Sequence, residues 1–351
     1  MNCAREERPA IQIQNRETMA SSSLSRVLPL FRVSPRRFPS LSPSLSSSSL
    51  AAPSALGLSA SSLSTASDMS SPPQPVRPDR MPSTSTHTRD AGRWRPMCLY
   101  HTQGKCTKMD DPIHLEKFNH NAARDLQVSD ADLEHVCPQD LDHFLVLDLE
   151  GKVEILEFPV LIIDAKSLSI VDLFHRFVRP SQMSETRVNE YIEGKYGKFG
   201  VDRVWHDTAI PFEEVIGEFE TWLAQHHLWA KEQGGKLNRA AFVTCGNWDL
   251  KTKVPQQCKV SRIKLPGYFM EWINLKDVYL NFYHREARGM MAMMRQLDIS
   301  VQGSHHLGMD DTKNITRVLQ RMLINGAVMR ITAWRSPKSP DRVQFAYQNR
   351  I

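Results

Sequence analysis

The sequence predicts an α/β domain over residues 140–332, in which a central mixed sheet is flanked by helices. Two apolar runs, at 144–147 and 240–244, have the length and composition of buried strands. Strand-like and helix-like segments follow one another along the chain in mixed order. A stretch of roughly 190 residues is ample for a single hydrophobic core.

The remaining elements are predicted from their periodicity. Residues 158–163 and 170–178 have strand patterns, and residues 212–223 and 290–297 have the spacing of amphipathic helices. Apolar residues at 315, 318, 319, 322 and 323 predict a further helix. This mixture of strands and helices predicts an α/β sandwich with a central sheet.

Two acids end the first apolar run. Asp148 and Glu150 are two residues apart, so on a strand their side chains project from the same face. Adjacent carboxylates are costly to desolvate unless a cation neutralises them, and hard oxygen ligands suit Mg²⁺ or Mn²⁺ rather than zinc. By itself, an Asp-x-Glu pair is more often an ordinary strand that runs into an acidic turn.

Two later fragments add acids and a histidine. Asp249 follows the 240–244 run after a Gly-Asn turn, where a helix could begin, and such an aspartate alone is more often an N-cap. Asp311 precedes the predicted helix at 315–323, with His306 in a loop five residues before it. A loop histidine beside a metal site can accept a proton from water, although a surface His-His pair with a capping aspartate would give the same pattern.

In this order, the fragments resemble the motifs of the DEDDh exonucleases: Asp-x-Glu, a later Asp, and His-x-x-x-x-Asp. Over roughly residues 140–332 the chain is most similar to their Eri-type branch, the histone-mRNA 3′ exonucleases. The resemblance implies a ribonuclease H-like fold, with two Mg²⁺ ions held by Asp148, Glu150, Asp249 and Asp311, and with His306 as general base. Other matching stretches are Glu157-Phe158-Pro159-Val160, Trp248-Asp249, Gln257-Cys258, Ser261-Arg262, Trp272-Ile273-Asn274, Asn281-Phe282-Tyr283 and Gly308-Met309-Asp310-Asp311-Thr312-Lys313-Asn314-Ile315.

The expected activity is that of a metal-dependent 3′-to-5′ exoribonuclease, which trims structured RNA such as ribosomal or small RNA and releases nucleoside 5′-monophosphates. The expected partner is RNA with a free 3′ end. A DNA 3′ exonuclease and a non-catalytic RNA-binding module are the alternatives. The sequence has neither a nucleophile elbow nor a glycine-rich phosphate loop, which excludes serine hydrolases and nucleotide-binding kinases.

The chain departs from the family pattern after Glu150. Relatives commonly carry an Ala-Thr pair and a loop at this point, whereas here residues 151–156 lead directly to Glu157. The first hairpin is therefore expected to be short, which puts in question how the terminal base and its sugar are held.

Overall charge does not identify the RNA-binding surface. The formal net charge is +5, but residues 1–97 hold 12 Arg, no Lys and 6 acids, so the remaining residues sum to −1. Local basic residues after Asp249 are the candidates for phosphate contacts, with a solvated helix face as the alternative. They are Lys251, Lys253, Lys259, Arg262 and Lys264.

Residues 94–125 predict a small zinc-finger-like module. Cys98, Cys106, His114 and His120 have a spacing that can close a tetrahedral Zn²⁺ site, with a plain loop as the alternative. A segment of about 25 residues rich in polar groups needs such a cross-link to fold. The Cys-aromatic-Gly-Cys and Pro-x-His parts resemble the PAR-binding (APLF-type) finger, whereas the opening resembles a CCCH RNA-binding finger. RNA is the preferred ligand because it would hold substrate for the neighbouring nuclease.

The two ends of the chain have biased compositions. Residues 1–93 predict a disordered Ser/Arg/Pro-rich leader and linker, and no acid occurs between Met19 and Thr65. This composition is typical of an organellar transit peptide, and Met19-Ala20-Ser21 resembles the start of a chloroplast one. The expected location is the chloroplast, or the cytoplasm or nucleus if the leader is not a transit peptide. Residues 333–351 are expected to be a flexible tail.

Overall fold

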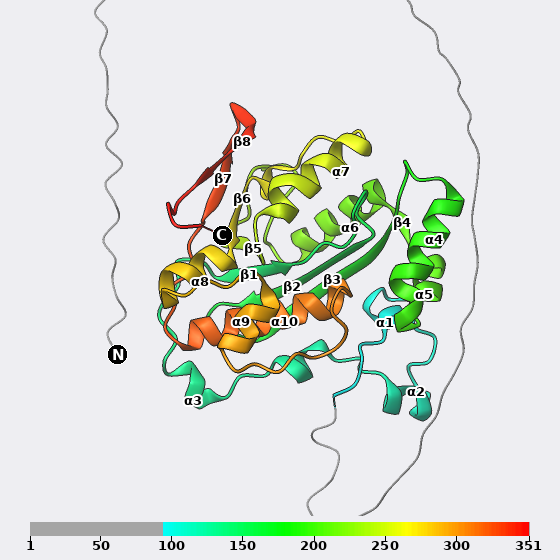
Figure 1. Ribbon diagram of the computed structural model, residues 1–351, viewed down its shortest axis with the longest axis horizontal. Coiled ribbons are helices and arrows are strands. Elements are labelled where there is room, and N and C mark those ends of the chain that lie inside the picture. The colour runs from blue at the N-terminus through cyan, green and yellow to red at the C-terminus, as the bar shows by residue number, and fades with distance from the viewer. Residues whose placement is uncertain (1–93, 351) are drawn as a thin grey trace, which may run out of the picture. The chain divides into compact units, whose positions relative to one another are not determined.

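The computed structural model describes residues 94–350, which contain one eight-stranded mixed sheet with helices on both faces (Figure 1). The predicted leader, residues 1–93, lies outside the described residues. The strand order is β4-β3-β2-β1-β5-β6-β7-β8, which confirms the predicted α/β class with a central mixed sheet. The strands are β1 (His143–Leu147), β2 (Glu157–Asp164), β3 (Ile170–Arg179), β4 (Ile210–Pro211), β5 (Ala240–Thr244), β6 (Glu271–Asn274), β7 (Ala333–Ser336) and β8 (Ser339–Phe345).

Strand β1 lies in the interior of the sheet. It pairs antiparallel with β2 and parallel with β5. Its side chains alternate between the two faces: Phe144 and Val146 join one hydrophobic core, and Leu145 and Leu147 join the other. Residues that follow β1 therefore emerge from a strand that is buried on both faces.

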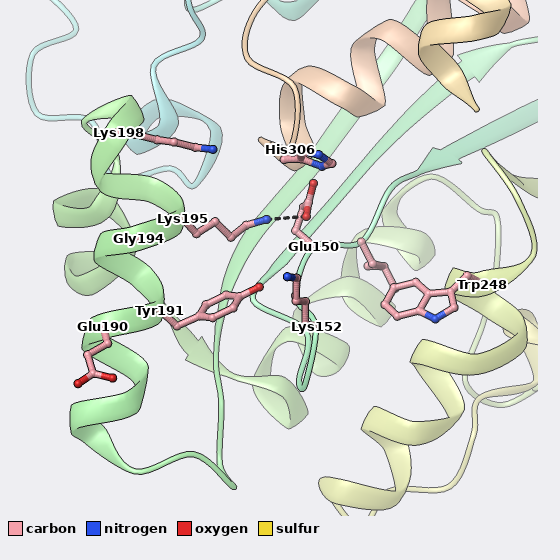
Figure 2. Close-up of a pocket in the computed structure, with 11 residues that line it drawn as sticks. Glu150, Lys152, Glu190, Tyr191, Gly194, Lys195, Lys198, Trp248 and His306 are labelled. Carbon is pink, nitrogen blue, oxygen red and sulfur yellow. Dashed lines mark hydrogen bonds and ion pairs between the residues drawn. The ribbon is translucent and has the colours of Figure 1, made fainter. Parts of the chain in front are cut away.

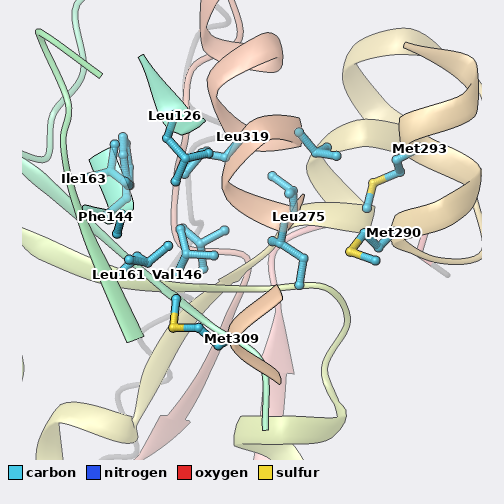
Figure 3. Packing of buried hydrophobic residues seen from close by; sticks show 14 of the residues in the cluster. Leu126, Phe144, Val146, Leu161, Ile163, Leu275, Met290, Met293, Met309 and Leu319 are labelled. Atoms are coloured by element: carbon cyan, nitrogen blue, oxygen red, sulfur yellow. The ribbon is translucent and has the colours of Figure 1, made fainter. Parts of the chain in front are cut away.

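Helices cover each face of the sheet. Figure 1 shows α8, α9 and α10 on one face and α6 and α7 on the other. Figure 3 shows the first core, where Met309 and Leu319 of α10 lie near Phe144 and Val146 of β1. The helices are α1 (Leu99–Thr102), α2 (Pro112–Lys117), η1 (Ala122–Leu126), α3 (Asp130–Leu133), α4 (Glu185–Tyr196), η2 (Gly197–Phe199), α5 (Asp202–Thr208), α6 (Phe212–Gln225), η3 (Asp249–Lys253), α7 (Val254–Val260), η4 (Gly267–Phe269), α8 (Leu275–Tyr283), α9 (Met290–Gln296) and α10 (Gly308–Ile324).

The segments with strong apolar periodicity have the secondary structure that the sequence predicted. The predicted strands at 158–163 and 170–178 are β2 and β3, and the predicted helices at 212–223, 290–297 and 315–323 lie in α6, α9 and α10. Among residues 94–350, no helix has both the length and the apolar character to cross a bilayer.

The prediction of a flexible tail was wrong for residues 333–345. These residues form β7 and β8, which extend the sheet beyond β6. Ala333 is fully buried, and the Arg335 guanidinium donates hydrogen bonds to the carbonyl oxygens of Leu250 (3.0 Å), Lys251 (2.5 Å) and Pro340 (2.6 Å). Composition misled the prediction because β8 is an edge strand whose side chains are mostly exposed.

We expect Arg335→Ala to lower the free energy of unfolding by about 2 to 3 kcal/mol, because three carbonyl groups, of which that of Leu250 is buried, lose a charged donor. The measurement is urea unfolding followed by circular dichroism. Arg342→Ala is the matched control, since Arg342 is exposed on β8. Equal stability of the two variants would contradict an ordered role for this hairpin.

Candidate active site

Four carboxylates meet beside the end of β1. Asp148 and Glu150 follow β1, Asp249 begins the π-helical turn η3 after β5, and Asp311 lies in the first turn of α10. Carboxylate oxygens of Asp148, Glu150 and Asp311 lie within 4.8 Å of one another. All four acids and His306 line one cavity of about 600 Å³. The structure thus brings together the five residues that the sequence indicated.

Burial and mutual repulsion disfavour ionisation of these acids. Burial, followed by the charges of Asp249 and Asp311, raises the pKa of Asp148 well above its ordinary value. Burial raises the pKa of Glu150 to about 7 in spite of the Lys195 ammonium, and it raises the pKa of Asp249 to about 6. A bound cation would stabilise such a buried set of acids in the charged form.

The donor set fits hard divalent cations. It offers carboxylate oxygens, which Mg²⁺ and Mn²⁺ prefer. Lys195 Nζ lies 2.5 Å from Glu150 Oε2 and balances part of the negative charge. Asp148, Glu150, Asp249 and Asp311 are therefore the residues that can hold divalent ions.

The loop before α10 holds two histidines over Asp311. The His306 N–H donates to Asp311 Oδ2 at 2.7 Å, and His305 Nδ1 lies 3.0 Å from the same oxygen. The two rings stack with 3.9 Å between their centroids. Burial and the neighbouring His305 lower the pKa of His306, which favours the neutral ring that can accept a proton.

Gly303 determines the path of this loop. Its φ is +79°, and a Cβ atom there would lie 2.3 Å from the carboxylate of Asp310. That carboxylate accepts a hydrogen bond from the Ser304 N–H at 2.8 Å. A side chain at position 303 would therefore displace the loop that carries both histidines.

A fifth carboxylate, Glu157, holds the N-terminus of α10. Fully buried, it accepts hydrogen bonds from the N–H groups of Gly308 (3.0 Å) and Met309 (2.9 Å) and from the Tyr196 hydroxyl (3.1 Å). Although burial opposes ionisation, contacts with His175 and the two amides hold the pKa of Glu157 below its ordinary value. Sequence reasoning noted Glu157 only within a matching stretch; the available signal was a lone carboxylate at the start of an apolar strand.

Three lysines surround a second cavity of about 650 Å³, which shares Glu150 and His306 with the first. Figure 2 shows Lys195 and Lys198 on one side, from α4 and η2, and Lys152 on the other side, from the short hairpin. These lysines were not predicted, because their contribution depends on α4, an element that the sequence analysis did not identify. A basic cavity beside an acid cluster suits a chain of phosphates whose terminal linkage is held by cations.

The basic residues proposed from the sequence line neither of these two cavities. Lys253 is wrong as a phosphate contact: it is buried, its Nζ donates to the Lys152 carbonyl at 3.0 Å, and burial lowers its pKa to about 8. Gln257 accepts a hydrogen bond from the Ile155 N–H at 2.8 Å. The side chains of Lys253 and Gln257 therefore both hold the backbone of the short hairpin. The exposed members of the set are Lys251, Lys259, Arg262 and Lys264.

A second donor cluster consists of Cys98, Cys106, His114 and His120, whose ligand atoms all lie within 4.8 Å of one another. The Nε2 atoms of the two histidines are 3.1 Å apart, and Cys106 Sγ lies 3.5 Å and 3.9 Å from them. A tetrahedron with ordinary Zn–S and Zn–N bonds has edges of about 3.3 to 3.8 Å, so these distances fit one ion. Burial raises the pKa of the Cys98 thiol, which a coordinated metal would ionise.

Four acids and a histidine, gathered at strand ends of a mixed sheet, define the site of a metal-dependent nuclease. A family model described as RNase_T, exonuclease, matches residues 131–319. The chain belongs to this exonuclease family, so it is a hydrolase, and its DEDDh site implies divalent metal ions.

Individual relatives agree with this assignment. An uncharacterized exonuclease domain-containing protein of Arabidopsis thaliana is 66% identical over 272 residues, 77% of this chain and 81% of that one. The 3′-5′ exoribonuclease 1 of Rattus norvegicus is 33% identical over 205 residues, 54% of this chain and 55% of the rat protein, so the match spans about half of its length. A solved structure, described as 3′-end specific recognition of histone mRNA stem-loop by 3′-exonuclease, is 26% identical with a TM-score of 0.50. The match covers 59% of this chain and 92% of that one.

Proposed function

We propose that this protein is a 3′-to-5′ exoribonuclease that trims the 3′ ends of structured RNA, such as ribosomal or small RNA. The observation that carries the proposal is the single cavity lined by Asp148, Glu150, Asp249, Asp311 and His306. Relatives that are named as a 3′-5′ exoribonuclease and as a 3′-exonuclease bound to an RNA stem-loop support both the direction of attack and the substrate.

The residues divide the chemistry between them. Asp148, Glu150, Asp249 and Asp311 would hold two divalent ions, with Mg²⁺ as the expected metal and Mn²⁺ as a substitute. When bound, such ions lower the pKa of a water molecule and stabilise charge on the departing 3′ oxygen. His306 accepts the proton of the attacking water, and the product is a nucleoside 5′-monophosphate.

The test is incubation of the purified chain with 5′-labelled RNA and Mg²⁺. We expect the label to move through a ladder of products shortened one nucleotide at a time, and we expect a 3′-phosphorylated RNA to resist. Degradation that Asp148→Asn leaves unchanged would contradict the assignment. Binding without degradation would favour the RNA-binding module, and faster attack on DNA of the same sequence would favour a DNA exonuclease.

The lysines of the second cavity are expected to contact the phosphates of the RNA. In an Asp148→Asn background, Lys152→Ala and Lys198→Ala should each weaken RNA binding and reduce the slope of log K against log salt by about 0.7. Fluorescence anisotropy across a salt series measures this slope. Lys259→Ala is the control, because Lys259 is exposed outside both cavities. A larger effect of Lys259→Ala would instead favour the basic set after Asp249.

We further propose that Cys98, Cys106, His114 and His120 bind one Zn²⁺ ion. Two thiols and two imidazoles at tetrahedral spacing are a donor set that zinc prefers over Mg²⁺. Mass spectrometry of the purified protein should find about one zinc per chain. Cys106→Ser should lose this zinc, whereas Cys258→Ser should keep it, since Cys258 is buried outside the cluster. Equal zinc content in both variants would contradict the site.

Import into the chloroplast is proposed from the composition of residues 1–93 alone. A fusion of residues 1–97 to a fluorescent protein should accumulate in chloroplasts of plant cells. A diffuse cytosolic signal would contradict this location.

A further inference from the structure

The Cys/His module, defined as residues 94–125, is built into the nuclease fold. Met97, Leu99 and Ala122 are buried in the same hydrophobic core as Phe144 of β1 and Leu319 of α10. The module therefore has no separate core of its own. It is joined to the active-site elements by two buried sets of polar contacts.

The first set leads from the module to the N-terminus of α10. The Thr102 hydroxyl lies 2.7 Å from His175 Nδ1. His175 Nε2 lies 3.2 Å from Glu157 Oε1, which is an ion-pair contact when the ring is protonated and does not have hydrogen-bond geometry. Thr102 is 8% exposed, and His175 and Glu157 are fully buried. Glu157 in turn accepts the N–H groups of Gly308 and Met309 at 3.0 and 2.9 Å. The Thr102 hydroxyl thereby orients the ring that faces the carboxylate on which α10 begins.

The second set reaches α10 beyond Asp311. The Cys98 N–H donates to the Asn119 carbonyl at 3.0 Å, and Asn119 Nδ2 donates to Asp125 Oδ2 at 3.1 Å. That oxygen accepts a hydrogen bond from Lys313 Nζ at 2.5 Å, and the Lys313 side chain is 4% exposed. This set begins at a cluster ligand, Cys98, and passes through the residue that precedes His120.

The two sets of contacts reach the first turns of α10 on either side of Asp311, one at Met309 and the other at Lys313. Buried polar groups have few arrangements in which each keeps its partner. A displacement of one group therefore moves the groups that contact it. Asp311 is a metal-binding acid, and its Oδ2 also fixes the backbone of His306 at 2.7 Å. Its position therefore depends on contacts that start in the module.

We propose that the Cys/His module is a structural metal centre that positions α10, and that metal bound by the Cys98–His120 cluster sets the geometry of Asp311 and His306 through these two sets of contacts. Thr102, His175 and Lys313 act as positioning residues. The proposal rests on the proposed function only in that the acid site binds divalent ions. It assigns the module a role in assembling the active site rather than in recognising RNA.

The test compares Thr102→Val with Thr102→Ser and with Thr107→Val, a matched control at an exposed position of the same module. Affinity of the acid site for Mn²⁺ is measured by calorimetry in the absence of RNA, and circular dichroism confirms folding. We expect Thr102→Val to weaken Mn²⁺ binding about 10-fold and to lower kcat with little change in KM. Thr102→Ser should restore both values, and Thr107→Val should match the unaltered chain.

A second arm removes the cluster's metal. Cys106→Ser should lose zinc and also bind Mn²⁺ more weakly, although Cys106 lines neither cavity beside the acids. Unchanged Mn²⁺ affinity in folded Thr102→Val, or in folded zinc-free Cys106→Ser, would overturn the proposal even if the melting temperature fell. A chain that binds Mn²⁺ but degrades no RNA would contradict the proposed function, while the Mn²⁺ comparison would still decide this inference.

Discussion

Replacement of Asp148 by Asn is expected to lower turnover by roughly 10³-fold or more, and at the same time to raise the thermal stability of the protein in Mg²⁺-free buffer. Activity falls because the cavity loses a carboxylate ligand at its centre. Stability rises because the folded state no longer buries this carboxyl group beside Asp249, Asp311 and Glu150; burial, followed by the charges of these acids, raises the pKa of Asp148. The melting temperature should increase by roughly 2 to 4 °C for each kcal/mol of repulsion removed.

The stability effect has a defined dependence on pH. An acid whose pKa is raised in the folded state destabilises that state as pH rises from the ordinary pKa to the folded pKa, because only the folded state still binds the proton over this interval. The unaltered protein should therefore lose stability as pH rises from 3.8 to about 6 for Asp249 and from 4.5 to about 7 for Glu150, and the loss should be complete above this interval. Asp148→Asn should lose less over the same interval, because one of the interacting charges is gone.

Calorimetric melting on both sides of this interval measures the effect, in buffer without Mg²⁺. The buffer also contains no chelator, because a chelator would remove the zinc that the Cys/His cluster is proposed to bind. Asp130→Asn is the control, since Asp130 is exposed in the first turn of α3. Added Mg²⁺ should stabilise the unaltered chain more than Asp148→Asn. Identical melting curves for the two proteins in Mg²⁺-free buffer would show that repulsion between the acids does not matter.

Replacement of His306 by Ala is expected to lower kcat by about 10² to 10⁴-fold, because the attacking water loses its proton acceptor. His305→Ala is the matched comparison, because the two rings stack and both residues contact Asp311, His305 through its ring and His306 through its backbone N–H. His305→Ala should mainly weaken the response to Mg²⁺, since its Nδ1 lies 3.0 Å from Asp311, one of the carboxylates proposed to hold a metal ion. Single-turnover kinetics at saturating and limiting Mg²⁺ separate the two effects.

The pH profile distinguishes the roles further. A general base must be neutral, so kcat should rise with pH and level off above the pKa of His306. Burial and His305 lower that pKa, so the midpoint of the rise should lie below the ordinary value of 6.5. His306→Ala should lose this limb of the profile, and His305→Ala should retain it. The opposite pattern would assign the base to His305.

The acids and His306 could be predicted because each lies in a local sequence pattern. Asp148 and Asp249 follow apolar runs, and Asp311 precedes a helical run, so secondary structure alone places them near strand or helix ends. The spacing of the Cys/His cluster is likewise a local property of the chain. These local patterns can be recognised in the sequence without any knowledge of tertiary packing.

The residues that were missed depend on tertiary contacts. Lys195 lies in α4, a mostly polar helix of which only Ile192 and Tyr196 are buried, so its periodicity carried little signal. Lys253 belongs to a run of basic residues, yet the π-helical turn η3 directs it inward to the hairpin. Glu157 gains its role from a helix that begins 151 residues later. None of these relations is encoded in neighbouring residues.

Several contacts that build the active site join residues far apart in the sequence, and these contacts must form during folding. The hydrogen bond from the Leu149 N–H to Asp249 joins residues 100 apart, and that from the Gly308 N–H to Glu157 joins residues 151 apart. Contacts at such separations form slowly, since a long loop must close before they can stabilise anything. We therefore expect helices and local hairpins to appear early during refolding, and the capacity to bind divalent ions to emerge only in the final kinetic phase.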